Sequence, residues 1–330
     1  MSQVAIVGSG SWGTAVAVML QSCGHDVCLW SWKEEERDAI LRDGENREFL
    51  PGVVISKDIH LTCDISCVKG KDLVVLVSPS RAIRATAKAM APHILDKTPI
   101  VILSKGLEDQ TLKTLSEVVE EEIPNAVVAA LSGPSHAEEV ARRIPTACVA
   151  ACKDEQVAKH IQNIFMCDYF RVYTNNDVLG VELGAALKNV IALCAGITDG
   201  IGFGDNTKAA LMTRGIKEIA RLGVKMGARA ETFYGLAGIG DLIVTCTSMH
   251  SRNRRAGILI GKGKRLEETL KEVHMVVEGV YSSGAAYALS KKYNVEMPII
   301  TEAYHVLFDG LSPRDAVVNL MKRDKKDEII

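Results

Sequence analysis

The segment Val4-Ala5-Ile6-Val7-Gly8-Ser9-Gly10-Ser11-Trp12-Gly13 decides the fold, because it places a G-x-G-x-x-G motif directly after a strand-like apolar run. A helix-forming stretch, residues 14–20, follows at once, and a second apolar run, residues 27–30, comes at the spacing of a βαβ unit. In such a unit the three glycines permit a tight turn, a close approach of a pyrophosphate and close packing of helix on strand. The segment predicts dinucleotide binding through Gly8, Gly10 and Gly13, the alternative being a glycine turn used only for packing.

The pattern of apolar runs and helical segments along the chain predicts two domains. Short apolar runs alternate with helical stretches at residues 4–7, 27–30, 73–77, 100–103, 127–131, 147–151 and 170–172. Continuously apolar runs are typical of strands covered by helices on both faces, in a mostly parallel, doubly wound sheet. After residue 176 only segments of helical period follow. We expect an α/β fold, with a Rossmann-like domain over residues 1–176 and an all-α domain over residues 177–330 that binds substrate and carries catalytic residues.

Composition narrows the partners and the location. The 330 residues include 39 Lys and Arg against 41 Asp and Glu. The protein therefore has no net positive charge that would attract nucleic acid or an anionic membrane. No apolar run is expected to reach the roughly 18–20 residues of a membrane span. The nine cysteines contain no C-x-x-C pair, and the eight histidines form no H-x-x-x-H pair. We therefore expect a cytoplasmic protein without a disulfide framework or a metal site.

The end of the second predicted strand bears on the choice of cofactor. It reads Trp30-Ser31-Trp32-Lys33, and no carboxylate appears before Glu34. NAD-specific sites usually place Asp or Glu here to bind the ribose 2′-hydroxyl. Ser31 and Lys33 would instead suit a 2′-phosphate, so we predict that NADPH is preferred and NADH possible. The alternative is that Trp32 and Lys33 are only a surface aromatic residue and a solvated cation.

Polar residues follow three of the predicted strands, at Ser78-Pro79-Ser80, Ser104-Lys105-Gly106 and Ser132-Gly133-Pro134-Ser135. Open α/β sheets bind their ligands at the carboxyl ends of the strands. A lysine directly after a strand would point into that crevice. We interpret Lys105 as a cation that faces a ligand, the alternative being a plain surface lysine.

The helical half supplies a second set of polar residues. Lys188, followed by Asn189, is embedded in an apolar helical stretch. A buried ammonium needs a partner or a lowered pKa, and a nearby second cation such as Lys105 would also lower it. Such a lysine can act as a general acid or base, whereas the plainer interpretation is a structural lysine that reaches solvent. Asp241, after a glycine-rich run, can accept a hydrogen bond from a hydroxyl or an amine.

The segment Ser251-Arg252-Asn253 precedes a predicted helix. A guanidinium group and the free N–H groups of a helix N-terminus together suit a phosphate dianion. The alternative for this basic segment is a solvated helix face.

These residues occur in motifs that run in order over nearly the full length. The motifs are Gly8-Ser9-Gly10-Ser11-Trp12-Gly13-Thr14-Ala15, Phe49-Leu50-Pro51-Gly52, Ser104-Lys105-Gly106-Leu107-Glu108, Ser132-Gly133-Pro134-Ser135, Leu187-Lys188-Asn189-Val190, Gly204-Asp205-Asn206-Thr207-Lys208-Ala209-Ala210, Gly238-Ile239-Gly240-Asp241-Leu242, Ser251-Arg252-Asn253 and Val277-Glu278-Gly279. With this set of motifs the sequence resembles the bacterial-type NAD(P)-dependent glycerol-3-phosphate dehydrogenases.

The resemblance implies that the protein interconverts dihydroxyacetone phosphate and sn-glycerol 3-phosphate, chiefly as a reduction that feeds glycerophospholipid synthesis, and that it is a homodimer. Lys188 would exchange the proton on the C2 oxygen, with its amine held by Asn189 and Asp241, and Lys105 would contact both substrate and cofactor. The implied substrate-binding residues are Lys105, Gly133, Ser135, Lys188, Asp241, Ser251, Arg252 and Asn253. The implied cofactor-binding residues, beside the three glycines, are Ser11, Trp12, Trp32, Lys33, Phe49, Lys105, Ala137, Arg252, Val276 and Glu278.

Two positions depart from the family pattern, and two other functions are kept as alternatives. Trp32 and Lys33 stand where the family more often has His or Arg, and His136 stands where many relatives have Phe. A related 6-phosphogluconate or 3-hydroxyacid dehydrogenase would share the architecture and the lysine. A non-catalytic dinucleotide sensor would keep the glycine loop without needing Lys105, Lys188 and Asp241 together.

Overall fold

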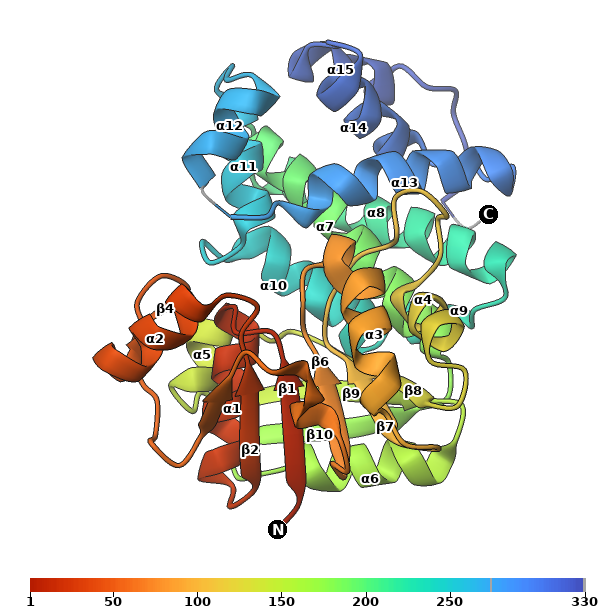
Figure 1. The fold of residues 1–330 in the computed structure, drawn as a ribbon. Helices are drawn as coiled ribbons and strands as arrows, with labels where there is room; N and C mark the ends of the chain where they lie inside the picture. Colours follow the sequence, from red (N-terminus) through yellow and green to blue (C-terminus); the bar gives the residue numbers. More distant parts are fainter. Residues whose placement is uncertain (274, 329–330) are drawn as a thin grey trace. The chain divides into compact units, whose positions relative to one another are not determined.

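The computed structural model, shown in Figure 1, describes residues 1–273 and 275–328 and divides into two compact units. Unit 1 comprises Met1–Ala185 and Ala228–Asp241, and unit 2 comprises Ala186–Gly227 and Leu242–Ile330. Because neither unit is continuous in sequence, the domain boundary between residues 176 and 177 stays a prediction.

Unit 1 is built on an eight-stranded sheet of order β10-β9-β8-β7-β6-β1-β2-β5. Every neighbouring pair is parallel except β8 and β9, which confirms the mostly parallel sheet and places the carboxyl ends of β6, β7 and β8 at one edge. A separate pair, β3 and β4, is antiparallel. The strands are β1 (Gln3–Val7), β2 (Asp26–Trp30), β3 (Glu45–Asn46), β4 (Leu50–Val54), β5 (His60–Thr62), β6 (Leu73–Leu76), β7 (Pro99–Ile102), β8 (Val127–Ser132), β9 (Thr146–Cys152) and β10 (Phe170–Asn175).

Helices cover both faces of this sheet. Val4 and Ile6 of β1 pack in one core cluster with residues of α1 and α6, while Ala5 and Val7 pack in another with residues of α3 and α4. Successive side chains of a strand point to opposite faces, so a strand buried on both faces is apolar throughout. The helices of this unit are α1 (Ser11–Ser22), α2 (Glu34–Asp43), α3 (Ile83–Met90), α4 (Leu115–Glu122), α5 (Ala137–Ala141), α6 (Glu155–Phe165) and α9 (Ala230–Phe233), with a π-turn at Leu236–Gly240 and short 3-10 turns at Ile65–Val68, Ser80–Ala82 and Ala91–His93.

Unit 2 is helical, as predicted for the second half of the chain: no strand occurs among the described residues after β10. Its core cluster draws residues from α7, α11, α13 and α14. The helices that lie wholly or partly in it are α7 (Val178–Ile201), α8 (Asp205–Met226), α10 (Asp241–Thr247), α11 (Arg252–Gly261), α12 (Leu266–Val273), α13 (Glu278–Lys292), α14 (Pro298–Phe308) and α15 (Pro313–Met321).

Helices α7 and α11 touch backbone to backbone. A Cβ atom added at Gly196 would lie 2.0 Å from the carbonyl oxygen of Arg254, and one added at Gly257 would lie 2.0 Å from that of Leu193. No side chain larger than hydrogen fits at either position. The separation of these two helices is therefore fixed by glycine.

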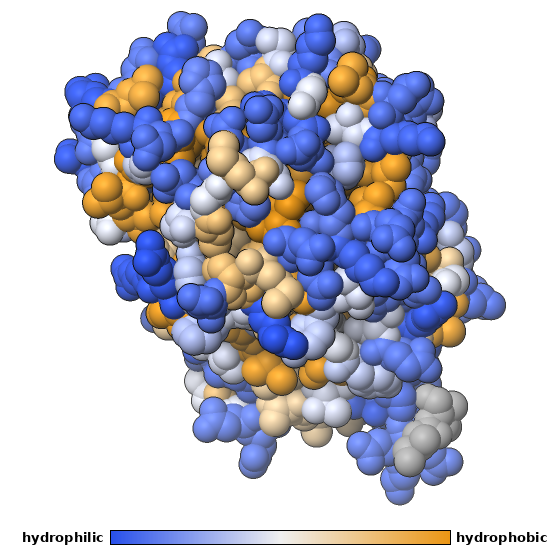
Figure 2. Space-filling model, turned by 90° about the horizontal axis from the view of Figure 1, so that it is seen from below, coloured by the Kyte–Doolittle hydropathy of each residue, from blue (hydrophilic) through white to orange (hydrophobic). Residues whose placement is uncertain are grey.

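Helix α7 corrects one expectation. Its 24 residues are long and apolar enough to cross a membrane by length and composition, so the expectation that no apolar segment reaches that length is wrong. However, 89% of its most apolar window is buried inside the protein. Figure 2 shows hydrophobic residues among hydrophilic ones on one face of the surface, and none of the large exposed hydrophobic residues in the described part of the chain comes from α7. A largely apolar helix that is buried is typical of a protein core.

Candidate active site

The glycine loop between β1 and α1 has the geometry of a phosphate-binding turn. Gly8 has a φ of +128°, and a Cβ atom at Gly13 would lie 1.8 Å from the carbonyl oxygen of Gly8, so both positions require glycine. A Cβ atom at Gly10, in contrast, would have no atom within 4 Å. Gly10 caps α1 without a side-chain hydrogen bond, and the first turn of α1, which begins at Ser11, contains no acidic residue. The open space at Gly10 and the positive helix end fit the pyrophosphate of a dinucleotide.

Three predicted cofactor residues of unit 1 gather beside this loop. Trp12 packs in one small apolar cluster with Leu50 and Ala137, and Phe49 directly precedes Leu50. Ala137 is the first residue of α5. The structure thus brings Trp12 and Ala137 together, although they lie far apart in the sequence.

Asn46 holds the glycine loop, a role that the sequence did not indicate. Its buried Nδ2 donates to the carbonyl oxygen of Ser9 (2.7 Å) and to Oγ1 of Thr14 (3.0 Å), while its Oδ1 accepts from the N–H of Phe49 (3.2 Å). An asparagine in a polar stretch gives no local signal of such a role. The loop and the segment at Phe49 are therefore joined through one amide.

At the end of β2 the structure places a carboxylate that the sequence analysis did not consider. Ser31 is buried, whereas Lys33 and Trp32 are exposed, Trp32 at 73%. Oε2 of Glu36, in the first turn of α2, accepts hydrogen bonds from Ser9 (3.3 Å) and Ser31 (3.4 Å). The predicted 2′-phosphate donors therefore have an acidic neighbour.

Lys105, just after β7, contacts Gly133, just after β8. Its Nζ donates to Oδ2 of Asp241 (2.7 Å) and to the carbonyl oxygen of Gly133 (3.1 Å). Asp241 is 1% exposed, and Oγ of Ser132 lies 3.5 Å from the same Oδ2. A buried carboxylate is costly unless it is paired and hydrogen-bonded. The pairing fixes an ammonium group at the carboxyl edge of the sheet.

Gly133 has a role that needs glycine. It has a φ of +151°, and a Cβ atom there would lie 2.9 Å from the carbonyl oxygen of Ala147. Its own carbonyl accepts from Lys105 and, at 3.1 Å, from Oγ of Ser135.

Burial raises the pKa of the neighbouring Cys148 thiol to about 12, so this cysteine is no nucleophile at neutral pH.

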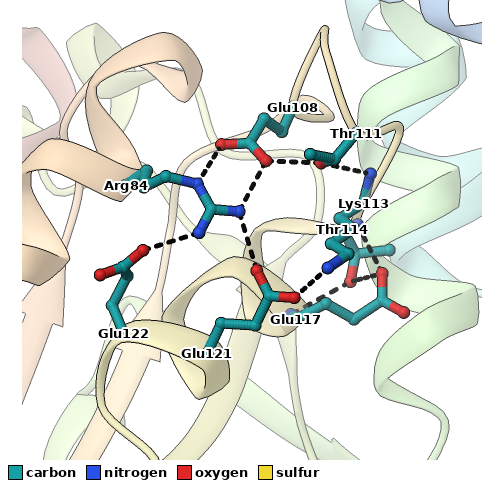
Figure 3. A network of polar contacts seen from close by, with 8 residues as sticks. All are labelled: Arg84, Glu108, Thr111, Lys113, Thr114, Glu117, Glu121 and Glu122. Carbon is teal, nitrogen blue, oxygen red and sulfur yellow. Dashed lines mark hydrogen bonds and ion pairs between the residues drawn. The ribbon is translucent and has the colours of Figure 1, made fainter.

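A polar network, shown in Figure 3, anchors the segment that carries Lys105. Arg84 of α3 donates to both carboxylate oxygens of Glu108 (2.7 and 2.8 Å), and also to Glu121 (2.8 Å) and Glu122 (2.7 Å) of α4. The hydrogen bonds from Arg84 are the main reason why the pKa of Glu108 is lowered. Because Glu108 lies three residues after Lys105, the network fixes this segment against α3 and α4.

The far end of the same segment is tied to α7. Thr114 begins α4 with a capping box to Glu117, and the N–H of Ser116 donates to Glu182 (2.9 Å). Burial raises the pKa of Glu182 to about 7. The segment after Lys105 is thus held at both ends, and none of these holding residues was singled out for such a role from the sequence.

Arg84→Met should lower the free energy of unfolding by more than the loss of a single surface ion pair does, because Glu108, Glu121 and Glu122 lose their shared partner. Urea unfolding followed by circular dichroism measures this. Arg81→Met is the matched control, since Arg81 pairs with Asp109 (2.8 Å) on the same segment but is 57% exposed, and it should cost less than about 1 kcal/mol. Equal losses in the two variants would contradict a special role for Arg84.

In unit 2, Lys188 lies on α7 with 5% exposure, and its Nζ donates to Oγ1 of Thr245 (2.6 Å) on α10. Thr245 gives no signal of this role in the sequence, because it stands in the unremarkable run Val244-Thr245-Cys246. Burial with a polar partner is the environment predicted for a lysine acid or base. That Asn189 and Asp241 hold this amine stays a prediction.

Asn189 and Asn253 lie together in unit 2. Nδ2 of Asn253 donates to Oδ1 of Asn189 (2.9 Å), and Oδ1 of Asn253 accepts from the N–H of Gly279 (2.8 Å). Gly279 follows Glu278, the first residue of α13, while Val276 nearby is exposed. The structure therefore links α7, α11 and the start of α13, where two predicted cofactor residues lie.

The start of α11 has the form predicted for a phosphate site. Ser251 caps the helix by accepting from the N–H of Arg254 (3.2 Å), and the first turn contains no acidic residue. Two nitrogens of Arg254 bind Asp199, each at 2.8 Å, so this arginine is engaged within the fold. Arg252, half-buried at the first helical position, is the candidate for binding a phosphate.

Comparison with known proteins agrees with these features. Residues 3–158 match the family model described as NAD-dependent glycerol-3-phosphate dehydrogenase N-terminus, and residues 177–318 match the C-terminus model of the same family. The glycerol-3-phosphate dehydrogenase (NAD(P)+) of Fusobacterium nucleatum is 53% identical over 332 residues, which cover 100% of this chain and 99% of the relative. That of Agathobacter rectalis is 54% identical over 329 residues, with 99% and 98% covered. The crystal structure of glycerol-3-phosphate dehydrogenase from Coxiella burnetii matches with a TM-score of 0.94 and 38% identity, over 98% of this chain and 99% of that chain. The chain therefore belongs to the NAD-dependent glycerol-3-phosphate dehydrogenase family.

Proposed function

We propose that the protein is an NAD(P)-dependent sn-glycerol-3-phosphate dehydrogenase that reduces dihydroxyacetone phosphate to sn-glycerol 3-phosphate, a reversible step that supplies glycerophospholipid synthesis. The observation that carries the proposal is the buried Lys188 of unit 2, whose amine donates to Thr245. A dinucleotide sensor without catalysis has no need to bury an amine in this way.

Reduction of a ketone needs a hydride at carbon and a proton at oxygen. Bound NAD(P)H supplies the hydride. Lys188, as an ammonium, donates its proton to the C2 oxygen as negative charge develops there, and in the oxidising direction its amine takes that proton from the hydroxyl. Thr245 fixes the direction of the amine. In unit 1, Lys105, kept in place by Asp241 and Gly133, is the cation proposed to contact both substrate and cofactor.

The substrate phosphate is bound by Arg252 with Ser251, Asn253 and the N-terminus of α11. A guanidinium group gives two parallel hydrogen bonds to a phosphate, and free backbone N–H groups add to them. Binding energy from this remote group holds the carbonyl carbon in place for the transfer.

Arg252→Ala should raise the KM for dihydroxyacetone phosphate roughly 10- to 100-fold, as expected when charged hydrogen bonds of about 1.5–3 kcal/mol are lost. Steady-state kinetics at saturating NADPH measure this. Arg255→Ala, which removes the same group from an exposed position on the same helix, is the control and should change KM less than about twofold. A KM in Arg252→Ala like that of the wild type would place the phosphate site elsewhere.

Four finer properties belong to the same proposal. NADPH is preferred and NADH is used, because Lys33 offers an exposed cation next to the end of β2. The reaction needs no metal, and the protein acts as a homodimer in the cytoplasm. The ratio of kcat/KM for the two coenzymes, activity after chelation and light scattering after gel filtration test the first three.

Activity with different substrates tests the reaction itself. The proposal expects that oxidation of NADPH depends on dihydroxyacetone phosphate. Turnover only with 6-phosphogluconate or a 3-hydroxyacid and the oxidised coenzyme would show a related dehydrogenase. Coenzyme binding without any turnover would show a sensor.

A further inference from the structure

We infer that Glu36 sets the selectivity between NADH and NADPH, by placing a carboxylate at the position where the two coenzymes differ. The inference rests on the proposed NAD(P)-dependent function and deepens it. It concerns unit 1 alone.

The position of Glu36 follows from its contacts. Its Oε2 accepts from Oγ of Ser9, in the glycine loop, and from Oγ of Ser31, directly after β2. These two hydroxyl oxygens are themselves 3.0 Å apart. The carboxylate therefore lies between the loop that binds the pyrophosphate and the strand end that faces the adenosine ribose in this fold.

An acidic residue at this point normally belongs to the end of the second strand and binds the ribose 2′-hydroxyl. Here β2 ends in Trp30 and Ser31, and the acid comes from the first turn of α2. A hydroxyl can donate to this carboxylate, whereas a 2′-phosphate carries like charge and is repelled. Glu36 therefore favours NADH over NADPH at this end of the site.

Lys33 strengthens the same effect. Its Nζ lies 3.8 Å from Oε1 of Glu36, so the cation best placed to attract a 2′-phosphate already faces a carboxylate. Glu36 thus opposes the preference for NADPH in two ways, by direct repulsion and by neutralising Lys33. The outcome expected for the wild type is a small preference that admits both coenzymes.

Replacing Glu36 with Gln tests the inference, because Gln keeps the size and removes the charge. Dissociation constants of NADH and NADPH are measured by nicotinamide fluorescence without substrate, at low ionic strength. In Glu36→Gln the ratio Kd(NADH)/Kd(NADPH) should rise about tenfold, mainly through tighter NADPH binding, and the change should shrink in high salt. Glu35→Gln, the same charge change at the exposed neighbouring position, should leave the ratio within about twofold of the wild type.

A double-mutant cycle tests the part of Lys33. Lys33→Met should weaken NADPH binding more in the Glu36→Gln background than in the wild type, because only there is the ammonium free of its carboxylate partner. Equal losses in the two backgrounds would overturn the neutralisation of Lys33 by Glu36.

The remaining outcomes separate this inference from the proposed function. If all variants bind both coenzymes and Glu36→Gln leaves the ratio unchanged, Glu36 does not set selectivity, and the dehydrogenase assignment stands. If the wild type binds neither coenzyme, both fail.

Discussion

Replacing Lys188 with alanine should lower kcat for the reduction of dihydroxyacetone phosphate by about a thousandfold, within the range that proton transfer by a positioned group contributes. The methyl side chain can neither protonate the C2 oxygen nor bind Thr245, which accepts from Lys188 at 2.6 Å. Loss of NADPH absorbance measures turnover, and fluorescence titration should show nearly unchanged NADPH binding.

Two comparisons make this result specific. Lys225→Ala, at an exposed position in the last turn of α8, should leave kcat within about twofold of the wild type. Thr245→Val keeps the volume and removes the acceptor, so it should lie between the wild type and Lys188→Ala. Turnover in Lys188→Ala within tenfold of the wild type would remove this lysine from the chemistry.

Lys105→Met should abolish most activity and also lower the free energy of unfolding by roughly 3 kcal/mol, the cost of leaving a buried charge without its partner. Asp241 is 1% exposed and accepts from Lys105 at 2.7 Å. The variant therefore removes the ammonium partner of a carboxylate that water does not reach. Urea unfolding measures the stability, and loss of NADPH absorbance measures the activity.

The double variant Lys105→Met, Asp241→Asn separates the two effects. Removing the carboxylate charge that has lost its ammonium should recover most of the lost stability, because a neutral amide is cheaper to bury than a carboxylate. Activity should stay lost, since the ammonium group is still missing. A double variant that is as unstable as Lys105→Met alone would show that the ion pair is not the cause.

The strands were predictable where burial on both faces leaves a continuous apolar run, and they were missed elsewhere. Strand β5 has the sequence His60-Leu61-Thr62, with a single apolar residue, and β4 contains Pro51 and Gly52, which are depleted in strands. The direction of β9 could not be predicted either, because an apolar run does not indicate whether a strand pairs parallel or antiparallel with its neighbour. Its antiparallel pairing with β8 is set by the tertiary fold.

The residues of the candidate site also fall into those that could be predicted from the sequence and those that could not. Sequence motifs were enough to propose the glycine loop and Lys105, because spacing and position after a strand are local properties. Asn46, Thr245 and Glu36 escaped notice because each acts on residues remote from it in the sequence: Asn46 on Ser9, Thr245 on Lys188 and Glu36 on Ser9. Only folding brings those side chains to their partners.

The glycine contact between α7 and α11 limits how this site can be redesigned. Lys188 and Asn189 lie on α7, while Arg252 and Asn253 begin α11, and the helices meet without an intervening layer of side chains. The distance between the two helices cannot be shortened by smaller side chains, because the contact is already made by glycine. Enlarging Gly196 or Gly257 would instead force the helices apart and break the hydrogen bond between Asn189 and Asn253. The spacing between these two groups of residues is therefore set by the backbone of unit 2.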